Sequence, residues 1–86
     1  MYSIVYTKRA KSDIVKLKEI GLDKKAKSFI DLLRDNPFVS QPSFEKLNGD
    51  LSGAYARRIN IKHRLVYQVD ENEKTVKIIM MWIHYE

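Results

Sequence analysis

Residues 54–85, AYARRINIKHRLVYQVDENEKTVKIIMMWIHY, contain three β-strand patterns in succession. Each is rich in β-branched or aromatic residues, and together they cover residues 54–60, 63–69 and 74–85. Only Ile61 and Lys62 separate the first two patterns, and the turn-forming DENE at 70–73 separates the last two. Because short turns join neighbouring strands in antiparallel order, this stretch predicts an antiparallel meander.

The preceding residues predict one strand, two helices and a second, weaker strand. The strands cover residues 2–6 and 44–47, and the helices cover residues 8–20 and 24–36. Apolar residues recur at helical spacing in both helices, and Thr7 and Asp23 are the expected N-caps. The order βααββββ predicts an α+β fold in which two helices cover one face of the sheet. The other face is left uncovered, and a site can be built there.

Composition limits the class of protein. Eighty-six residues are enough for one domain, which we expect to cover residues 1–86. Lys and Arg number 16 against 11 Asp and Glu, and the net charge of +5 favours an anionic partner: nucleic acid, an acidic protein or a membrane surface. The chain has no cysteine, no evident signal peptide and no apolar run of the ~20 residues that a membrane span needs. Charge alone does not choose among these partners. We expect a cytosolic globular protein without a membrane partner.

Arginines concentrate around the first hairpin of the meander. Arg57 and Arg58 are neighbours in one strand, so they point to opposite faces, and one of them must lie toward the helices or at an edge. A two-residue loop would place Arg58 opposite Leu65, whereas a three-residue loop or a bulge would place it opposite Arg64. In the second case two guanidinium groups share a face and could hold a phosphate between them. The sequence leaves both registers open.

The last strand pattern is apolar on both faces until it becomes polar at His84 and Tyr85. Strict alternation would put Val76, Ile78, Met80, Trp82 and His84 on one face. The other face would then carry Lys77, Ile79, Met81, Ile83 and Tyr85. Such a strand is expected to be central in the sheet. Two histidines without Cys, an HExxH motif or a dense acidic cluster predict neither a metal site nor a cofactor.

Together these residues resemble a known family. The specific parts are Leu51-Ser52-Gly53, Arg57-Arg58-Ile59, the HRLVY block at 63–67 and His84-Tyr85. They are similar to the YoeB/Txe toxins of the RelE superfamily, which are ribosome-dependent endoribonucleases (mRNA interferases) of type II toxin–antitoxin systems. The resemblance covers the whole chain in length and element order. It implies a RelE-like fold: a twisted antiparallel sheet of four to five strands with two helices on one face.

The resemblance also assigns site residues. It implies that Glu45 is the general base, Arg64 stabilises the transition state and His84 is the general acid, while Arg58 and Tyr85 bind substrate. The chain departs from the family twice. Asn48 stands where members often have lysine, so Lys46 is a substitute phosphate ligand, although its side chain is expected on the other face. Glu86 follows the closing tyrosine as an additional residue.

The implied chemistry is metal-independent cleavage of mRNA in the ribosomal A site. The ribose 2′-OH attacks the adjacent phosphorus, giving a 2′,3′-cyclic phosphate, or the 3′-phosphate it opens to, and a 5′-OH. The implied partners are a YefM-like antitoxin with an acidic, disordered C-terminal segment, the ribosome, and operator DNA bound only as the toxin–antitoxin complex. A homodimer is left open. Lysine-rich helix starts are expected to contact rRNA.

The alternative is a non-catalytic basic module of the same fold that binds RNA or an antitoxin. Such a module needs the arginines but not the glutamate, because a carboxylate facing a phosphate weakens binding. The co-occurrence of Glu45, Arg64 and His84 therefore favours the enzyme.

Overall fold

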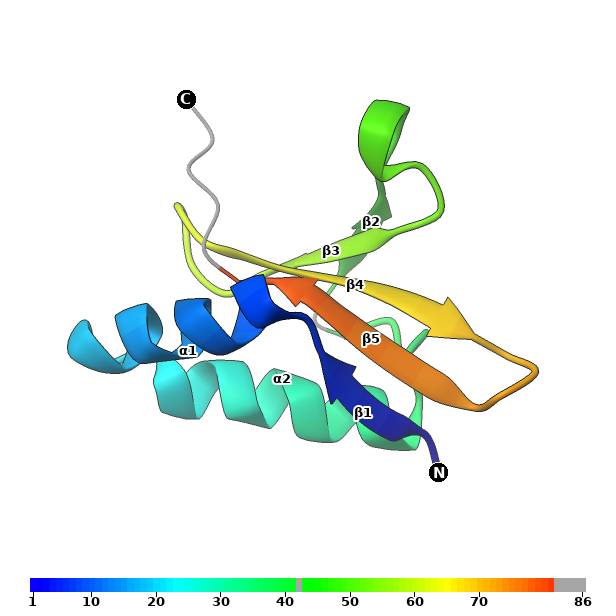
Figure 1. The fold of residues 1–86 in the computed structure, drawn as a ribbon, viewed down its shortest axis with the longest axis horizontal. Helices are drawn as coiled ribbons and strands as arrows, with labels where there is room; N and C mark the ends of the chain where they lie inside the picture. The colour runs from blue at the N-terminus through cyan, green and yellow to red at the C-terminus, as the bar shows by residue number, and fades with distance from the viewer. Residues whose placement is uncertain (42, 82–86) are drawn as a thin grey trace.

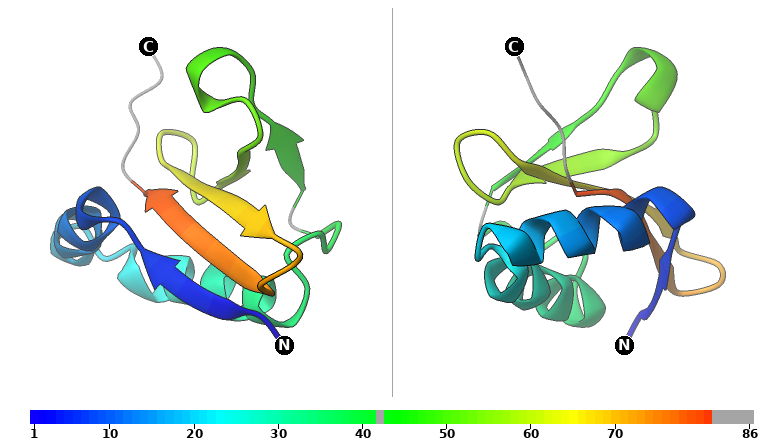
Figure 2. Two further views of the ribbon diagram at one scale, coloured as in Figure 1. Left: turned by 45° about the vertical axis from the view of Figure 1, so that its right-hand side comes forward. Right: turned by 60° about the vertical axis from the view of Figure 1, so that its left-hand side comes forward.

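The computed structural model describes residues 1–41 and 43–81. Within them the chain forms β1 (Ser3–Tyr6), α1 (Lys8–Glu19), α2 (Asp23–Asp35), β2 (Phe44–Lys46), a 3₁₀ turn η1 (Gly49–Leu51), β3 (Tyr55–Arg58), β4 (Arg64–Asp70) and β5 (Thr75–Met80). The two helices lie side by side on one face of the sheet (Figures 1 and 2). The predicted α+β architecture is therefore confirmed. No described helix has the length and apolar character needed to cross a membrane.

The sheet has the strand order β1-β5-β4-β3-β2. Strands β2 to β5 pair antiparallel, as the meander predicts, but β1 pairs parallel with β5, so the sheet is mixed. No hairpin joins β1 to β5, because the chain leaves β1 directly into α1. The argument from short turns therefore does not apply to this pair.

The main apolar core lies between the helices and the sheet. It is built from Ala10, Leu17, Ala26, Phe29, Ile30, Leu33, Ile59, Leu65, Tyr67, Val76, Ile78 and Met81. A smaller cluster on the opposite face consists of Ala54, Ala56 and Val66, with Leu47, Leu51, Ile79 and Met80 packed against it. The face expected to be uncovered is therefore partly covered by the segment around η1.

A bulge in β5 changes the predicted alternation of the last strand. Tyr67 pairs with Ile78, but Val66, the residue before Tyr67 in β4, pairs with Met80. The extra residue on β5 reverses which face each later side chain takes. Met80 consequently joins the smaller cluster and Met81 joins the main core, so the prediction was wrong for these two residues.

The two helices differ in how their N-termini are capped. Thr7 caps α1 as predicted, because its Oγ1 accepts a hydrogen bond from the Ala10 N–H at 3.0 Å. The cap predicted at Asp23 was wrong: α2 begins at Asp23, and Leu22 occupies the cap position without a side-chain hydrogen bond. Asp23 lies instead in the first turn, where its charge interacts favourably with the helix dipole.

The N-cap residue of α1 and a side chain within the helix also hold the end of β5. The Thr7 hydroxyl donates to the Ile79 carbonyl at 2.6 Å. Asp13 is 2% exposed, and its Oδ2 accepts the Met81 N–H at 3.0 Å. The bulged end of the strand is thus bound to the helix by directional hydrogen bonds.

Replacing Thr7 with Ala removes both hydrogen bonds of its hydroxyl. We expect the free energy of unfolding to fall by about 1–2 kcal/mol in urea denaturation followed by circular dichroism. Thr7→Ser should recover most of the loss because it keeps the hydroxyl. Ser12→Ala, on the exposed surface of α1, is the control, and an equal loss in the two alanine variants would contradict the capping role.

Replacing Asp13 with Ala leaves the Met81 N–H without its acceptor in a buried place. The expected loss in the same measurement is about 1–3 kcal/mol. Asp13→Asn retains an acceptor oxygen and should be the milder change. A stability of Asp13→Ala equal to that of the wild type would show that the bond to Met81 contributes nothing.

Candidate active site

The register of β3 against β4 places two arginines directly opposite each other. Arg58 pairs with Arg64, and Arg57 pairs with Leu65. Of the registers that the sequence leaves open, the protein therefore adopts the one that brings the two guanidinium groups onto one face. The connection is longer than the predicted hairpin, because β3 ends at Arg58 and β4 begins at Arg64.

Asn60 organises this connection. Its Oδ1 accepts hydrogen bonds from the N–H groups of Lys62 at 2.9 Å and His63 at 2.7 Å. The Ile59 N–H donates to the His63 carbonyl at 2.9 Å and closes the loop. An asparagine that binds the backbone two and three residues ahead favours a turn over a continuing strand. The side chain of Asn60 thereby helps to set the Arg58–Arg64 pair.

Glu45 lies on the same face as these arginines. It pairs with Ala56 across the β2–β3 ladder, and Ala56 is two residues from Arg58. The Glu45 Oε1 atom is 3.7 Å from the Arg64 Nε atom. A groove of about 320 Å³ is lined by Ser43, Phe44, Glu45, Ala56, Arg58 and Arg64. Three of the predicted site residues are therefore brought together.

The charges of this groove differ in exposure. The Arg64 side chain is 10% exposed, whereas that of Glu45 is 62% exposed. An ion pair with one exposed partner contributes only about 0–1 kcal/mol to stability, so Glu45 remains available for other contacts. Arg64 is fixed by burial, and Arg58 reaches into solvent. Such a pair of guanidinium groups can bind the oxygens of one phosphate.

Arg57 faces the opposite way and is 1% exposed. Its Nε donates to the Tyr67 hydroxyl at 2.9 Å, and its Nη2 donates to the Pro37 carbonyl at 3.0 Å. Burial raises the pKa of the Tyr67 phenol, although Arg57 acts in the opposite direction. The hydroxyl therefore stays protonated at neutral pH and donates to the Pro37 carbonyl at 3.0 Å. The sequence predicts that one of the two arginines lies toward the helices or at an edge, and Arg57 is that residue. The alternative of a binding module counts Arg57 among its ligand-binding arginines, and its burial contradicts that role.

The other predicted site residues do not join the groove in the described part of the chain. Lys46 pairs with Tyr55, so it lies on the face opposite to Glu45, as its place in the strand predicts. Asn48 is exposed just before η1. His84, Tyr85 and Glu86 lie outside the described residues, which end at Met81 in this region.

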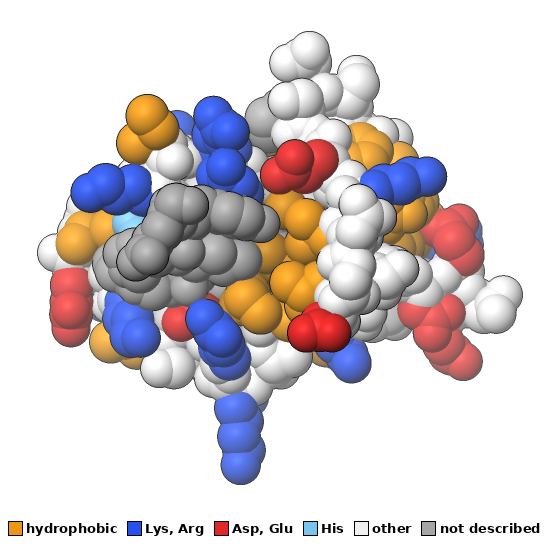
Figure 3. Space-filling view, turned by 90° about the horizontal axis from the view of Figure 1, so that it is seen from above, with side chains coloured by type: hydrophobic (Ala, Val, Ile, Leu, Met, Phe, Trp, Pro, Cys, Tyr) orange, Lys and Arg blue, Asp and Glu red, His pale blue; other side chains and the backbone are white. Residues whose placement is uncertain are grey.

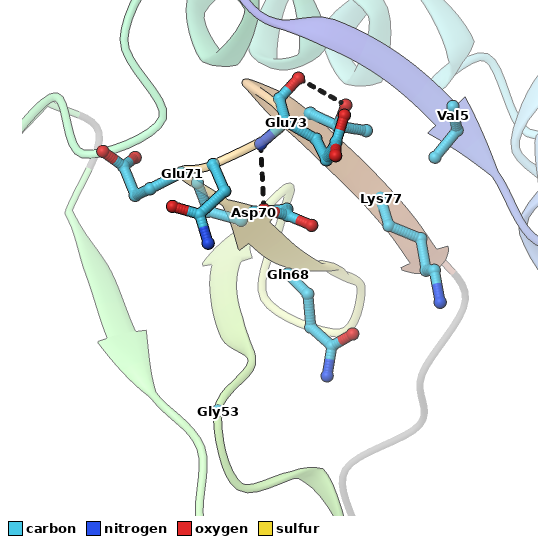
Figure 4. A pocket seen from close by; sticks show the side chains of 10 residues that line it. Val5, Gly53, Gln68, Asp70, Glu71, Glu73 and Lys77 are labelled. Carbon is cyan, nitrogen blue, oxygen red and sulfur yellow. Dashed lines mark hydrogen bonds between the residues drawn. The ribbon is translucent and has the colours of Figure 1, made fainter.

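A larger hollow of about 750 Å³ lies at the far end of the same face. Gln68 and Lys77 project into it from paired positions of β4 and β5, and Gly53 lies across from them (Figure 4). The last residue of β4, Asp70, and the turn that follows it, with Glu71 and Glu73, add carboxylates. These carboxylates repel a polyanion, so the smaller groove with two arginines fits a nucleic-acid phosphate better.

The surface seen from above, away from the helices, combines apolar and charged areas. An apolar patch lies near the middle of this view, and charged side chains of both signs lie around it (Figure 3). The patch agrees with the incomplete burial of Leu47, Leu51, Ile79 and Met80 around the smaller cluster. This face offers both apolar and charged surface to a partner.

Comparisons of the sequence and of the fold with known proteins point to the same family. The family model described as "YoeB-like toxin of bacterial type II toxin-antitoxin system" matches residues 6–85. Toxin YoeB of Streptomyces coelicolor is 42% identical over 55 residues, which span 64% of this chain and 62% of that toxin. The YoeB/ParE toxin from Agrobacterium tumefaciens superposes with a TM-score of 0.85 at 27% identity, covering 96% of this chain and 99% of that one.

A chain of the YoeB–YefM complex from Staphylococcus aureus superposes with a TM-score of 0.80 at 32% identity, covering 99% of both chains. The family model covers nearly the whole sequence, and the fold superposes on both of these solved structures over 96% or more of the chain. The chain therefore belongs to the YoeB-like toxins of bacterial type II toxin–antitoxin systems.

Proposed function

We propose that residues 1–86 form an endoribonuclease toxin that cleaves mRNA in the ribosomal A site and thereby inhibits translation. The observation that carries the proposal is the groove in which Glu45 Oε1 lies 3.7 Å from Arg64 Nε, with Arg58 directly opposite Arg64. Membership of the YoeB-like toxins supports it. The net charge of +5 favours a polyanionic substrate.

The first chemical step is removal of the proton from the ribose 2′-OH. Among the described residues, Glu45 is the only carboxylate that lines the groove. Its exposure allows an RNA strand to approach it from solvent. A positioned general base of this kind contributes on the order of 10²–10⁴-fold to a rate. We assign this step to Glu45.

The second step is attack of the 2′-oxygen on the adjacent phosphorus, which adds negative charge to the phosphate oxygens. Arg64 and Arg58 supply the compensating positive charge from paired positions on two strands. The buried Arg64 is already fixed, so little reorganisation is needed when the charge develops. Arg64 stabilises the transition state, and Arg58 binds the substrate phosphate from the exposed side.

The final step is protonation of the 5′-oxygen as it leaves. We assign it to His84, because an unperturbed imidazole titrates near a pH of about 6.5 and can donate a proton at neutral pH. Tyr85 is assigned to base stacking or phosphate orientation. The products are a 2′,3′-cyclic phosphate, or the 3′-phosphate derived from it, and a 5′-OH. DNA lacks the 2′-OH and is not cut by this route.

The proposal includes partners and a location. A relative from Staphylococcus aureus is described in complex with YefM, which supports a YefM-like antitoxin for this chain. An acidic segment of such an antitoxin matches the net positive charge of the toxin. We place the protein in the bacterial cytoplasm, where ribosomes and mRNA are found.

The test is a translation extract with one defined mRNA, in which new 5′ ends are mapped by primer extension. Wild-type protein should produce ends within translated codons. Glu45→Gln and His84→Ala should each reduce the cleavage rate by at least about a hundredfold, because each removes a proton-transfer group. Glu19→Gln, at the exposed end of α1, removes the same charge elsewhere and should cleave normally.

Ribosome binding is measured in parallel by co-sedimentation. Binding by Glu45→Gln should be retained, because Arg58 and Arg64 are unchanged. An mRNA with a single 2′-deoxy nucleotide at the mapped position should resist cleavage there. Folded wild-type protein that binds ribosomes but creates no new ends would contradict the enzyme and support a non-catalytic binding module.

A further inference from the structure

The strand that carries Glu45 is weakly held by itself. Strand β2 has three residues, and it lies at the edge of the sheet, so only β3 pairs with it. Glu45 and Lys46 are exposed, whereas the Phe44 side chain is half-buried. Phe44 is the side chain of β2 that packs against the protein, so what holds Phe44 helps to set the place of the Glu45 carboxylate on the next residue.

The Arg57 guanidinium holds Phe44. The two residues are direct partners in the β2–β3 ladder. The Arg57 Cζ atom lies 4.7 Å from the centroid of the Phe44 ring, which is the geometry of a cation–π contact. The other side of this arrangement is closed by Tyr55, whose ring meets Phe44 edge to face at 5.6 Å.

The same guanidinium also holds the start of the segment that leads into β2. Its Nη2 donates to the Pro37 carbonyl, just after α2, and its Nε donates to the Tyr67 hydroxyl. Tyr67 donates to the same carbonyl and so completes a closed set of three hydrogen bonds. One buried side chain thus fixes the segment from Pro37 to Phe44 at both of its ends.

We propose that Arg57 is a positioning residue for Glu45, acting through Phe44 and Pro37 on the strand that carries the general base. This inference rests on the proposed role of Glu45 in RNA cleavage. On this proposal the two adjacent arginines of β3 act on opposite faces of the sheet. Arg58 contacts the phosphate, and Arg57 determines the position of the Glu45 carboxylate.

A purely structural role would not require an arginine. Burying a charge is costly, and apolar side chains of similar volume often replace buried ions with no loss of stability. An apolar side chain cannot replace the two hydrogen bonds that the planar guanidinium donates to the Pro37 carbonyl and the Tyr67 hydroxyl. Arg57→Met is therefore the informative variant, since it fills the same space without the hydrogen bonds.

The test is a double-mutant cycle on the cleavage rate. In the wild-type background we expect Arg57→Met to lower kcat on the order of a hundredfold, the effect of displacing a catalytic group by about 1 Å. KM for mRNA-programmed ribosomes should change less than about threefold, because Arg58 and Arg64 are intact. In the Glu45→Gln background, Arg57→Met should change kcat by less than about threefold. Equal reductions in both backgrounds, or no reduction in either, would overturn the proposal.

A control variant separates positioning from general loss of stability. Leu33→Ala removes a fully buried side chain of α2 that does not line the groove, so it should destabilise the protein while leaving kcat within about threefold. A kcat of Leu33→Ala as low as that of Arg57→Met at matched stability would show that stability alone explains the effect.

Amide hydrogen exchange tests the same inference without any activity. The Leu47 N–H donates to the Ala54 carbonyl at 3.0 Å at the end of the β2–β3 ladder. We expect the amides of β2 and of Leu47 to exchange at least about tenfold faster in Arg57→Met, with the β4–β5 amides unchanged. Unchanged exchange in β2 would overturn the proposal. If wild-type protein fails to cleave mRNA, the proposed function fails, while this measurement still decides whether Arg57 holds β2.

Discussion

The pairing of Arg58 with Arg64 across β3 and β4 is the constraint on which the rest of the site depends. It is set by a connection that Asn60 closes through two backbone N–H groups. Because side chains alternate along a strand, this one register also turns Arg57 toward the helices. A slip by one residue would expose Arg57, bury Arg58 and separate both from their present contacts.

The groove and the core use the same residue types for opposite purposes. Arg58 and Glu45 stay exposed, so their charges remain available to a ligand. Arg57 is buried against Phe44 and Tyr67, where it contacts aromatic rings and a backbone carbonyl. A buried guanidinium is held in one geometry, whereas an exposed one adapts to its partner. The sheet separates the two uses by placing neighbouring arginines on opposite faces.

Most elements could be predicted from sequence, because apolar residues recur with the period of each element. The cap at Thr7 follows from local rules as well, and so does the placement of the two neighbouring arginines on opposite faces of the sheet. Three features of the structure do not follow from such local rules. The β3–β4 register depends on a turn whose sequence resembles a continued strand. The bulge in β5 falls in a run that is apolar on both faces, so the alternation of apolar and polar residues does not show which face each side chain takes. The parallel pairing of β1 has no local signal, because no hairpin sets it.

The proposed chemistry is placed on two short ends of the sheet: the three-residue edge strand β2 and the end of β5, from which the chain continues toward His84. Both ends are held by buried charged side chains that bind the backbone. Arg57 donates to the Pro37 carbonyl, and Asp13 accepts the Met81 N–H. Apolar burial stabilises a fold but has no direction, so it cannot by itself fix a short strand to within a fraction of an ångström. Charge-assisted hydrogen bonds have direction, and they are found where precise placement is needed. The apolar core therefore supplies stability, while Arg57 fixes the chain at Pro37, ahead of β2, and Asp13 fixes it at Met81, after β5.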